Sequence, residues 1–275
     1  SQGHTLMHQV DPAIEALSKS ILSYAMDRLR MDPPTIDHPL PQTTLEELAG
    51  QTITETGLGG KEALQLFIET LAPACISEDH PRYLAFVPTA PSEVSTLFDL
   101  VVGASNICAS SWLEGAGAIY AENQALRWIA DIAGLPAEAG GVFVSGGTAG
   151  NLSALVAARH DWRQRSPENA RQRGLIISSR GAHASVDQAA QVMDADLIQS
   201  GGHQLTGADV ISTIAELNAA DRSRLFAVAC TAGTTNLGII DDMQGISDVC
   251  NKESVWFHVD GAYGGAARAG PSPRD

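Results

Sequence analysis

The sequence is poor in positive charge. Seventeen lysine and arginine residues stand against 32 aspartate and glutamate residues, which gives a formal net charge of −15. Nucleic acids and anionic membranes are bound by basic surfaces, so this balance argues against either as a partner. A small anionic ligand stays compatible with the composition, because backbone N–H groups at a helix N-terminus can hold it without basic side chains.

The sequence also has few cysteines, and it shows neither a long apolar run nor the pattern of a signal peptide. The four cysteines form no CxxC pair, so we expect reduced, mostly buried thiols in a cytoplasmic protein. No run of about 18 apolar residues predicts a membrane span, and the first residues lack the regions of a signal peptide. His4 and His8 have the spacing of two ligands on one helix face, but without further ligands we predict no metal site.

The first half of the chain has the periodicity of helices. A length of 275 residues and a hydrophobic fraction of 44% suit one large domain or two small ones. Apolar spacing and proline boundaries predict helices over residues 10–31, 45–55, 61–71, 92–105 and 118–133. The first helix has a single apolar stripe and is followed by a proline-rich linker, so it must pack on its own domain or on a second subunit.

From Gly141 onward, strands alternate with helices. We predict strands over 141–144, 175–178, 196–198, 225–230 and 255–260, and helices over 152–163, 185–193, 206–218 and 242–252. Thr206 and Asp209 resemble a capping box at the start of one of these helices. Alternation of this kind predicts parallel βαβ units and an α/β fold.

Polar and glycine residues follow four of these strands. Gly146, Gly147 and Thr148 precede a helix, where free N–H groups favour a phosphate, although an ordinary β–α turn has the same appearance. The turn is neither a P-loop nor a dinucleotide fingerprint. His183 and Asp260 could each be simple capping residues. Because ligands bind outside the carboxyl ends of parallel strands, the coincidence of these junctions predicts one site at one sheet edge.

These junctions together resemble a known family. The segments are 145–152 (Ser-Gly-Gly-Thr-Ala-Gly-Asn-Leu), 182–186 (Ala-His-Ala-Ser-Val), 232–235 (Ala-Gly-Thr-Thr) and 258–265 (His-Val-Asp-Gly-Ala-Tyr-Gly-Gly), with His-Pro-Arg-Tyr at 80–83 and Phe-Val-Pro-Thr at 86–89. In this order they resemble the N-terminal part of the group II pyridoxal-phosphate-dependent amino-acid decarboxylases, which include the aromatic-L-amino-acid, glutamate and histidine decarboxylases. The resemblance runs from about residue 10 to residue 270.

The resemblance implies a fold and an activity. The fold is expected to be the fold-type I architecture of pyridoxal-phosphate-dependent transferases, with a mostly parallel sheet flanked by helices. Residues 1–90 would form a helical segment that pairs with a partner subunit, and residues 91–275 a large cofactor domain that is incomplete at its C-terminus. The implied activity is decarboxylation of an L-amino acid to an amine and CO2, with aromatic amino acids as one candidate class, by a cytoplasmic homodimer.

The resemblance also implies roles for individual residues. Asp260 would pair with the pyridine nitrogen of pyridoxal phosphate and keep it protonated, so that the ring accepts electrons. His183 would stack on the ring and orient the substrate. The remaining contacts would be Gly147 and Thr148 to the phosphate, Thr235 and Ala262 to the cofactor, and Thr89 to the substrate.

The sequence departs from the family pattern at the lysine. The family needs a Schiff-base lysine after the aspartate, whereas the only lysines here are Lys19, Lys61 and Lys252. We therefore expect the lysine to come from a segment outside this chain, and we expect this chain alone to be inactive. Before the helix at 118–133 only Glu122 matches the family. Two alternatives stay open: another pyridoxal-phosphate lyase or aminotransferase, and a non-catalytic half that completes a separate lysine-bearing chain.

Overall fold

The predicted alternation of strands and helices forms a four-stranded parallel sheet. The computed structural model describes residues 12–86, 89–169 and 171–270. The strands are β1 Leu175–Ser179, β2 Asp196–Ser200, β3 Leu225–Thr231 and β4 Trp256–Asp260, in the order β2-β1-β3-β4. Each neighbouring pair is parallel, which confirms the α/β expectation.

The chain divides into two compact units, residues 1–108 and 109–275. The first contains α1 Pro12–Leu29, α2 Gln42–Ala49, α3 Gly60–Leu66, the π-helical turn η1 Phe67–Leu71, and α4 Glu93–Ser105. The second contains the sheet with α5 Trp112–Ile132, α6 Gly147–Arg165, η2 Pro167–Asn169, α7 Ala184–Val192, α8 Gly207–Glu216, α9 Ala219–Arg224, α10 Met243–Glu253 and η3 Gly264–Ala269. The domain boundary that we predicted at residues 90 and 91 stays a prediction.

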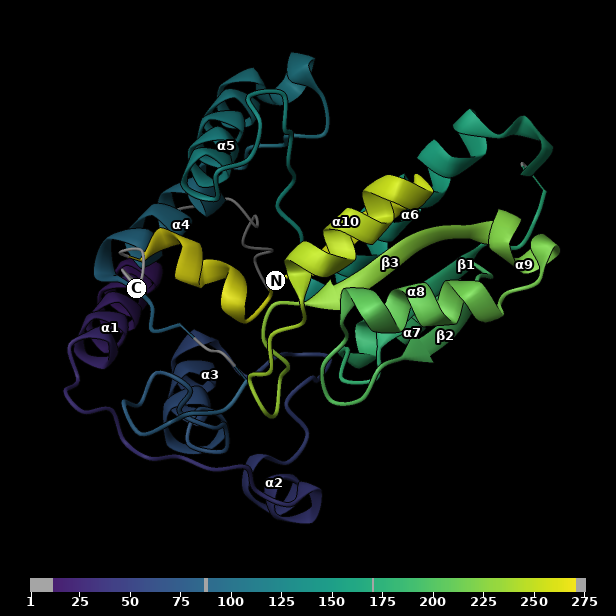
Figure 1. Cartoon of the computed structure of the whole chain (residues 1–275). Helices are drawn as coiled ribbons and strands as arrows, with labels where there is room; N and C mark the ends of the chain where they lie inside the picture. The colour runs from purple at the N-terminus through teal and green to yellow at the C-terminus, as the bar shows by residue number, and fades with distance from the viewer. Residues whose placement is uncertain (1–11, 87–88, 170, 271–275) are drawn as a thin grey trace. The chain divides into compact units, whose positions relative to one another are not determined.

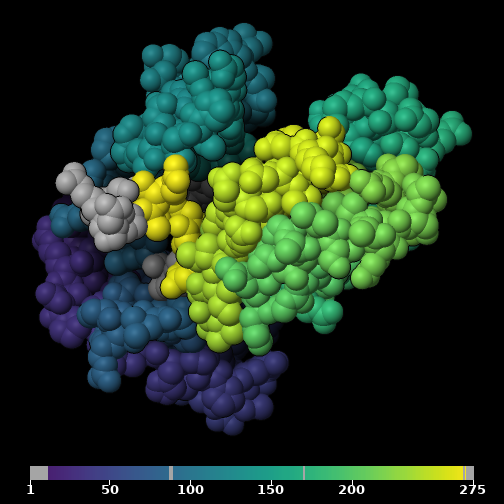
Figure 2. Space-filling model, viewed as in Figure 1, coloured from purple at the N-terminus to yellow at the C-terminus, as the bar shows by residue number. Residues whose placement is uncertain are grey.

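The sheet has an apolar layer on each face. One layer, with Ile176 and Ala229, packs under α6 and α7, and the other, with Ile177 and Val228, packs under α8 and α10. Successive strand residues point to opposite faces, so strands covered on both sides are apolar throughout. Figure 1 shows these helices on the two sides of the sheet, and Figure 2 shows α8 and α10 adjoining on the surface.

Local capping explains several helix starts. At α8, the Asp209 N–H donates to Thr206 Oγ1 at 3.2 Å and the Thr206 N–H donates to Asp209 Oδ2 at 2.9 Å, so the predicted capping box is confirmed. Ser92 caps α4 in the same way by accepting from the Ser95 N–H at 3.3 Å. These side chains satisfy N–H groups that have no partner within a helix.

Some predicted elements were wrong. Residues 141–144 form no strand, and Val142 and Phe143 are 64% and 54% exposed. A strand needs a neighbouring backbone to satisfy its N–H and C=O groups, and these four residues pair with no strand in the described part of the chain. The helix predicted over 45–55 ends at Ala49, because Gly50 takes a φ of 60°.

Helix starts were misplaced where glycines suggested a turn. α5 begins at Trp112, capped by Ser111, rather than at residue 118, although Gly115 departs from helical geometry. α6 begins at Gly147 rather than at Leu152, so the predicted glycine turn is the first turn of the helix itself. The short helix α9 was not predicted.

The other sequence-based expectations have mixed outcomes. Cys230 and Cys250 are buried as predicted, whereas Cys75 and Cys108 are exposed, so the expectation of mostly buried thiols was wrong for half of them. Among the described residues, no helix is both long and apolar enough to cross a membrane. His4 and His8 lie outside the described residues.

Candidate functional site

The carboxyl edge of the sheet gathers most of the predicted site residues. Asp260 is the last residue of β4 and lies in register beside Thr231, the last residue of β3. His183 follows β1 and immediately precedes α7. The loop after β3 carries Thr235, and α6 begins at Gly147. Parallel strands bring the ends of β1, β3 and β4 to a common edge, as the sequence predicted, whereas α6 follows residues 141–144, which form no strand.

Asp260 is a buried carboxylate with a fixed orientation. Asp260 is 8% exposed, and each oxygen of its carboxylate accepts one hydrogen bond. Oδ1 accepts from the Ala262 N–H at 3.1 Å, and Oδ2 accepts from Asn151 Nδ2 at 2.9 Å. A carboxylate oxygen has two acceptor positions, so one more donor can still bind to each.

The N-terminus of α6 lies against the turn that follows Asp260. A Cβ atom at Gly147 would lie 3.3 Å from the Cβ of Ala262, so the absence of a side chain permits this approach. Gly147 and Thr148 are both exposed, and they occupy the first helical turn, whose N–H groups have no partner within the helix. Such a terminus favours a bound anion, and the hydroxyl of Thr148 adds a possible donor.

His183 has the capping role that the sequence left open as the simpler interpretation. Its Nδ1 accepts from the Ser185 N–H at 3.2 Å and lies 2.9 Å from Ser185 Oγ. The residue is nevertheless exposed, and its Nε2 takes part in neither contact. The cap therefore orients the imidazole while the ring face stays accessible.

The loop after β3 is shaped by a glycine and by a buried acid. Gly233 has a φ of 96°, and a Cβ there would lie 2.6 Å from Tyr263 Cδ1, so only glycine fits. Asp241 accepts from the Leu205 N–H at 2.7 Å and from the Thr231 N–H at 2.8 Å. Burial raises the pKa of Asp241, and these hydrogen bonds oppose that rise. Thr235 is exposed on this loop.

Three residues of the site were not predicted individually. Asn151 and Ser185 occur in the recognised segments but were assigned no role, and His258 lies two residues before Asp260. All three are buried and belong to one hydrogen-bond network with Asp260. Burial lowers the pKa of His258, and the nearby charge of Asp260 only partly offsets this. In the sequence, these three residues could have been noticed as polar side chains at positions expected to be buried.

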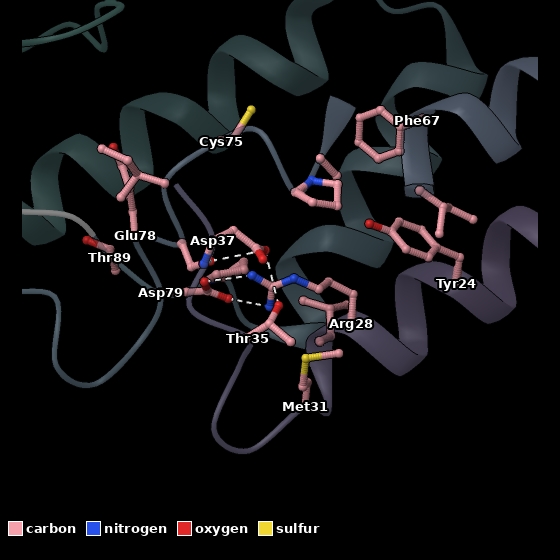
Figure 3. A pocket seen from close by; sticks show the side chains of 17 residues that line it. Tyr24, Arg28, Met31, Thr35, Asp37, Phe67, Cys75, Glu78, Asp79 and Thr89 are labelled. Carbon is pink, nitrogen blue, oxygen red and sulfur yellow. Dashed lines mark hydrogen bonds and ion pairs between the residues drawn. The ribbon is translucent and has the colours of Figure 1, made fainter. Parts of the chain in front are cut away.

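Thr89 belongs to the first unit, where it lines a cavity of about 1000 Å³. Figure 3 shows this cavity with Arg28 directed toward Asp79. Two hydrogen bonds of 2.6 and 2.7 Å join these side chains. The guanidinium of Arg28 is therefore already paired with a carboxylate.

The described residues contain no cluster of three or more side chains that could hold a metal ion. Lys252 lies in the last turn of α10 and lines a small pocket with Asp248 and Glu253. In the chain, α10 connects the carboxyl end of β3 to the amino end of β4. The last turn of α10 therefore lies at the amino edge of the strands and not at the edge that carries Asp260. Lys19 is paired with Glu15 on α1.

Comparison with protein families matches residues 48–274 to the conserved domain of the pyridoxal-dependent decarboxylases. An aromatic-L-amino-acid decarboxylase of Bacillus atrophaeus is 32% identical over 249 residues, which are 88% of this chain and 50% of that protein. An L-2,4-diaminobutyrate decarboxylase of Rhizobium meliloti is 31% identical over 218 residues, 78% of this chain and 43% of that protein. The chain spans about half the length of these relatives.

Solved structures show the same fold. A tryptophan decarboxylase of Catharanthus roseus, in complex with L-tryptophan, superposes with a TM-score of 0.84 at 16% identity, covering 97% of this chain and 60% of that one. The glutamate decarboxylase domain of a Vibrio parahaemolyticus protein gives a TM-score of 0.77 at 24% identity, covering 93% and 58%. The fold-type I expectation is thereby confirmed.

Proposed function

This chain belongs to the pyridoxal-dependent decarboxylase family, and on that premise we propose that it takes part in the decarboxylation of an L-amino acid to an amine and CO2. The observation that carries the proposal is the carboxylate of Asp260. It is buried at the carboxyl edge of the sheet, held by two N–H donors, and joined through Ala262 to the open N-terminus of α6.

The donor set at this edge fits pyridoxal phosphate. The group needs an anion site for its phosphate and a carboxylate for its pyridine nitrogen. Gly147 and Thr148 offer the first through the N-terminus of α6, and Asp260 offers the second through its remaining acceptor positions. Ala262 and Thr235 would line the cofactor between these two contacts, and His183 would cover the face of the ring.

Each residue has a definite task in the proposed reaction. When bound, pyridoxal phosphate supplies an electron sink for the electron pair that the departing CO2 leaves behind. The Asp260 carboxylate accepts a hydrogen bond from the pyridine N–H and so keeps the proton on that nitrogen. The exposed imidazole of His183 orients the substrate, and the N–H groups of α6 hold the phosphate. We assign Thr89 to the substrate, from its place in the family-like segment.

The lysine that attaches the cofactor is assigned to residues outside 1–275. Lys19 is ion-paired on α1, Lys61 lies in the first turn of α3, and Lys252 is at the amino side of the sheet. None of these positions follows Asp260 in the chain. We expect the present chain alone to be inactive and to lack a stable attachment to the cofactor.

The names of the relatives support the proposed substrate class, and exposed apolar residues of α1 support the proposed assembly. The 32% identical relative is named an aromatic-L-amino-acid decarboxylase and the 31% identical one an L-2,4-diaminobutyrate decarboxylase. We put an aromatic L-amino acid first because that relative matches more of the chain. We also propose that the protein works as a cytoplasmic homodimer, with α1 packing on the second subunit through its exposed Ile14, Ile21 and Leu22.

A substrate panel tests the activity. The full-length protein with pyridoxal phosphate is expected to release CO2 from an aromatic L-amino acid faster than from L-2,4-diaminobutyrate, L-glutamate or L-histidine. Amine and CO2 are measured together, because an aminotransferase would instead form an oxo acid and release no CO2. Formation of oxo acid alone would replace this proposal with the aminotransferase alternative.

Substitution of Asp260 tests the role of the carboxylate. Asp260→Ala in the full-length protein removes the acceptor for the pyridine N–H and is expected to reduce kcat by about 100- to 1000-fold, the usual cost of losing one electrostatic contact to the transition state. Asp248→Ala removes a carboxylate that is exposed on α10 and serves as the matched control. Unchanged kcat in Asp260→Ala would contradict the assignment.

A further inference from the structure

Asn151 lies at the centre of a buried hydrogen-bond network. It is 5% exposed and joins three elements: its own helix α6, the start of α7 and the end of β4. Its Oδ1 lies 2.8 Å from His258 Nε2, and its Nδ2 donates to Ser185 Oγ at 2.8 Å and to Asp260 Oδ2 at 2.9 Å. Every hydrogen-bonding atom of its side chain therefore has a partner.

The chemistry of the partners fixes the direction of each hydrogen bond. An ionised carboxylate only accepts, so the group of Asn151 that faces Asp260 must be the NH2 group. The carbonyl oxygen of Asn151 then faces His258, whose Nε2 must carry a hydrogen. The second hydrogen of the NH2 group points to Ser185, so Ser185 Oγ is an acceptor from Asn151.

The direction continues from Ser185 to His183. Ser185 Oγ accepts from Asn151 through one lone pair, and its own hydrogen can donate to His183 Nδ1 at 2.9 Å. The Ser185 N–H donates to the same nitrogen at 3.2 Å. An imidazole nitrogen that receives two donors carries no hydrogen, so the neutral ring of His183 has its hydrogen on Nε2.

We propose that Asn151 is a positioning residue that joins His258, Asp260 and, through the Ser185 hydroxyl, His183 in one hydrogen-bond network. It thereby fixes the orientation of the Asp260 carboxylate and supports, through the Ser185 hydroxyl, the Nε2–H tautomer of His183 that the Ser185 N–H also requires. The part of this inference that concerns the reaction rests on the proposed function, since there the same two side chains meet the cofactor. An amide is required at position 151, because one oxygen and two hydrogens must serve three partners.

Asn151→Asp preserves the shape of the side chain and removes both donated hydrogens. A carboxylate at position 151 can still accept from His258, but it faces Asp260 with a like charge. The hydroxyl of Ser185 then has a new acceptor and no longer donates to His183 Nδ1. Ser185→Ala removes only the branch to His183 and leaves the bond between Asn151 and Asp260 intact.

Nitrogen NMR of the imidazole and cofactor binding separate the two branches. In full-length protein labelled with 15N-histidine and free of cofactor, the His183 Nδ1 resonance is expected to shift in both Asn151→Asp and Ser185→Ala, as one of its two donors is lost. The dissociation constant of pyridoxal phosphate is expected to rise about tenfold or more in Asn151→Asp, because the charge-assisted hydrogen bond to Asp260 is lost. In Ser185→Ala it should rise less than about threefold.

The control is the other buried asparagine of this unit. Asn169 is also 5% exposed, and its Nδ2 lies 3.5 Å from the Ser223 carbonyl, away from the network. Asn169→Asp introduces the same charge at a buried site and is expected to leave both the His183 resonance and cofactor binding unchanged. If Asn151→Asp does not fold, Ser185→Ala alone still tests the branch to His183.

An unchanged Nδ1 resonance in Ser185→Ala, or an unchanged dissociation constant in a folded Asn151→Asp, would overturn the inference. These outcomes are distinct from failure of the proposed function. If Asp260→Ala keeps full activity while the Nδ1 resonance shifts as expected, the hydrogen-bond chain stands and the cofactor role of Asp260 falls. If Asp260→Ala is inactive but the resonance does not shift, only the role of Asn151 falls.

Discussion

The two compact units bury very different side chains. In the second unit, apolar side chains from Leu155 to Cys250 fill two layers on the faces of the sheet. In the described part of the first unit, the only buried residues are Ser77 and His80, and both are polar. The second unit therefore has a hydrophobic core of its own, whereas the first has none within the described residues.

This difference indicates which interactions stabilise each unit. Burial of apolar surface is the main favourable term in folding, and the sheet obtains it from its own helices. The first unit instead shows polar contacts, such as Arg28 with Asp79 and Ser77 with Asp37, while Val94 and Phe98 on α4 are each 64% exposed. Apolar side chains in such numbers on a helix surface indicate a contact surface, although the sequence predicted packing on a second subunit only for residues 1–90.

Matched phenylalanines give the largest test of this comparison. Phe226→Ala removes a fully buried ring in β3 and is expected to lower the free energy of unfolding by about 3–5 kcal/mol. Phe98→Ala removes an exposed ring from α4 and is expected to change it by no more than about 0.5 kcal/mol in the monomer. Denaturant unfolding of the full-length protein measures both. An equal loss for Phe98→Ala that grows with protein concentration would show that a second copy covers α4.

The pH dependence of the sheet unit gives a smaller effect. Burial lowers the pKa of His258 below its unfolded value of about 6.5, so the unfolded chain binds a proton first. The stability from neutral His258 is complete above that pH and is lost as the pH falls below it toward the folded pKa. His258→Gln keeps a donor for Asn151 and should flatten the decline in Tm between pH 7 and pH 5.

His160 provides the control for that measurement. It is exposed on α6, so His160→Gln should leave the slope of Tm against pH as it is in the unchanged protein. A slope that stays the same in His258→Gln would show that other groups of the sheet unit cause the acid sensitivity. Asp241 would not be among them, because burial raises its pKa and a raised carboxyl pKa favours stability at lower pH, opposite to His258.

The same contrast explains how far the sequence could predict the structure. The sheet was predictable because apolar strands covered on both faces keep their pattern in the sequence, and because parallel strands bring His183 and Asp260 to one edge. Gly147 follows no strand and lies at that edge through its close approach to Ala262. The absence of the strand predicted at 141–144 was not predictable, since strand pairing depends on a neighbour that local residues do not specify. Asn151 was missed because its role exists only through contacts with Ser185 and Asp260, which are 34 and 109 residues away.

The smallest expected effect concerns the ion pair of the first unit. Arg28 and Asp79 are 30% and 18% exposed, and the hydrogen bonds from Arg28 lower the pKa of Asp79. The pair therefore adds stability above the unfolded carboxyl pKa and loses it as the pH falls through the folded value. Asp79→Asn should cost at most about 1 kcal/mol at pH 7, and less as the pH falls below the unfolded carboxyl pKa.

Hydrogen exchange decides whether that small effect is local. If polar contacts hold the described part of the first unit, Asp79→Asn should speed amide exchange in α1 and in the segment around Asp79 while the sheet keeps its protection. Glu93→Gln, which breaks the more exposed pair with Arg30, is the control and should change exchange less. Equal acceleration in β1 and β3 would mean that the two units unfold together, and that the apolar layers of the sheet also stabilise the first unit.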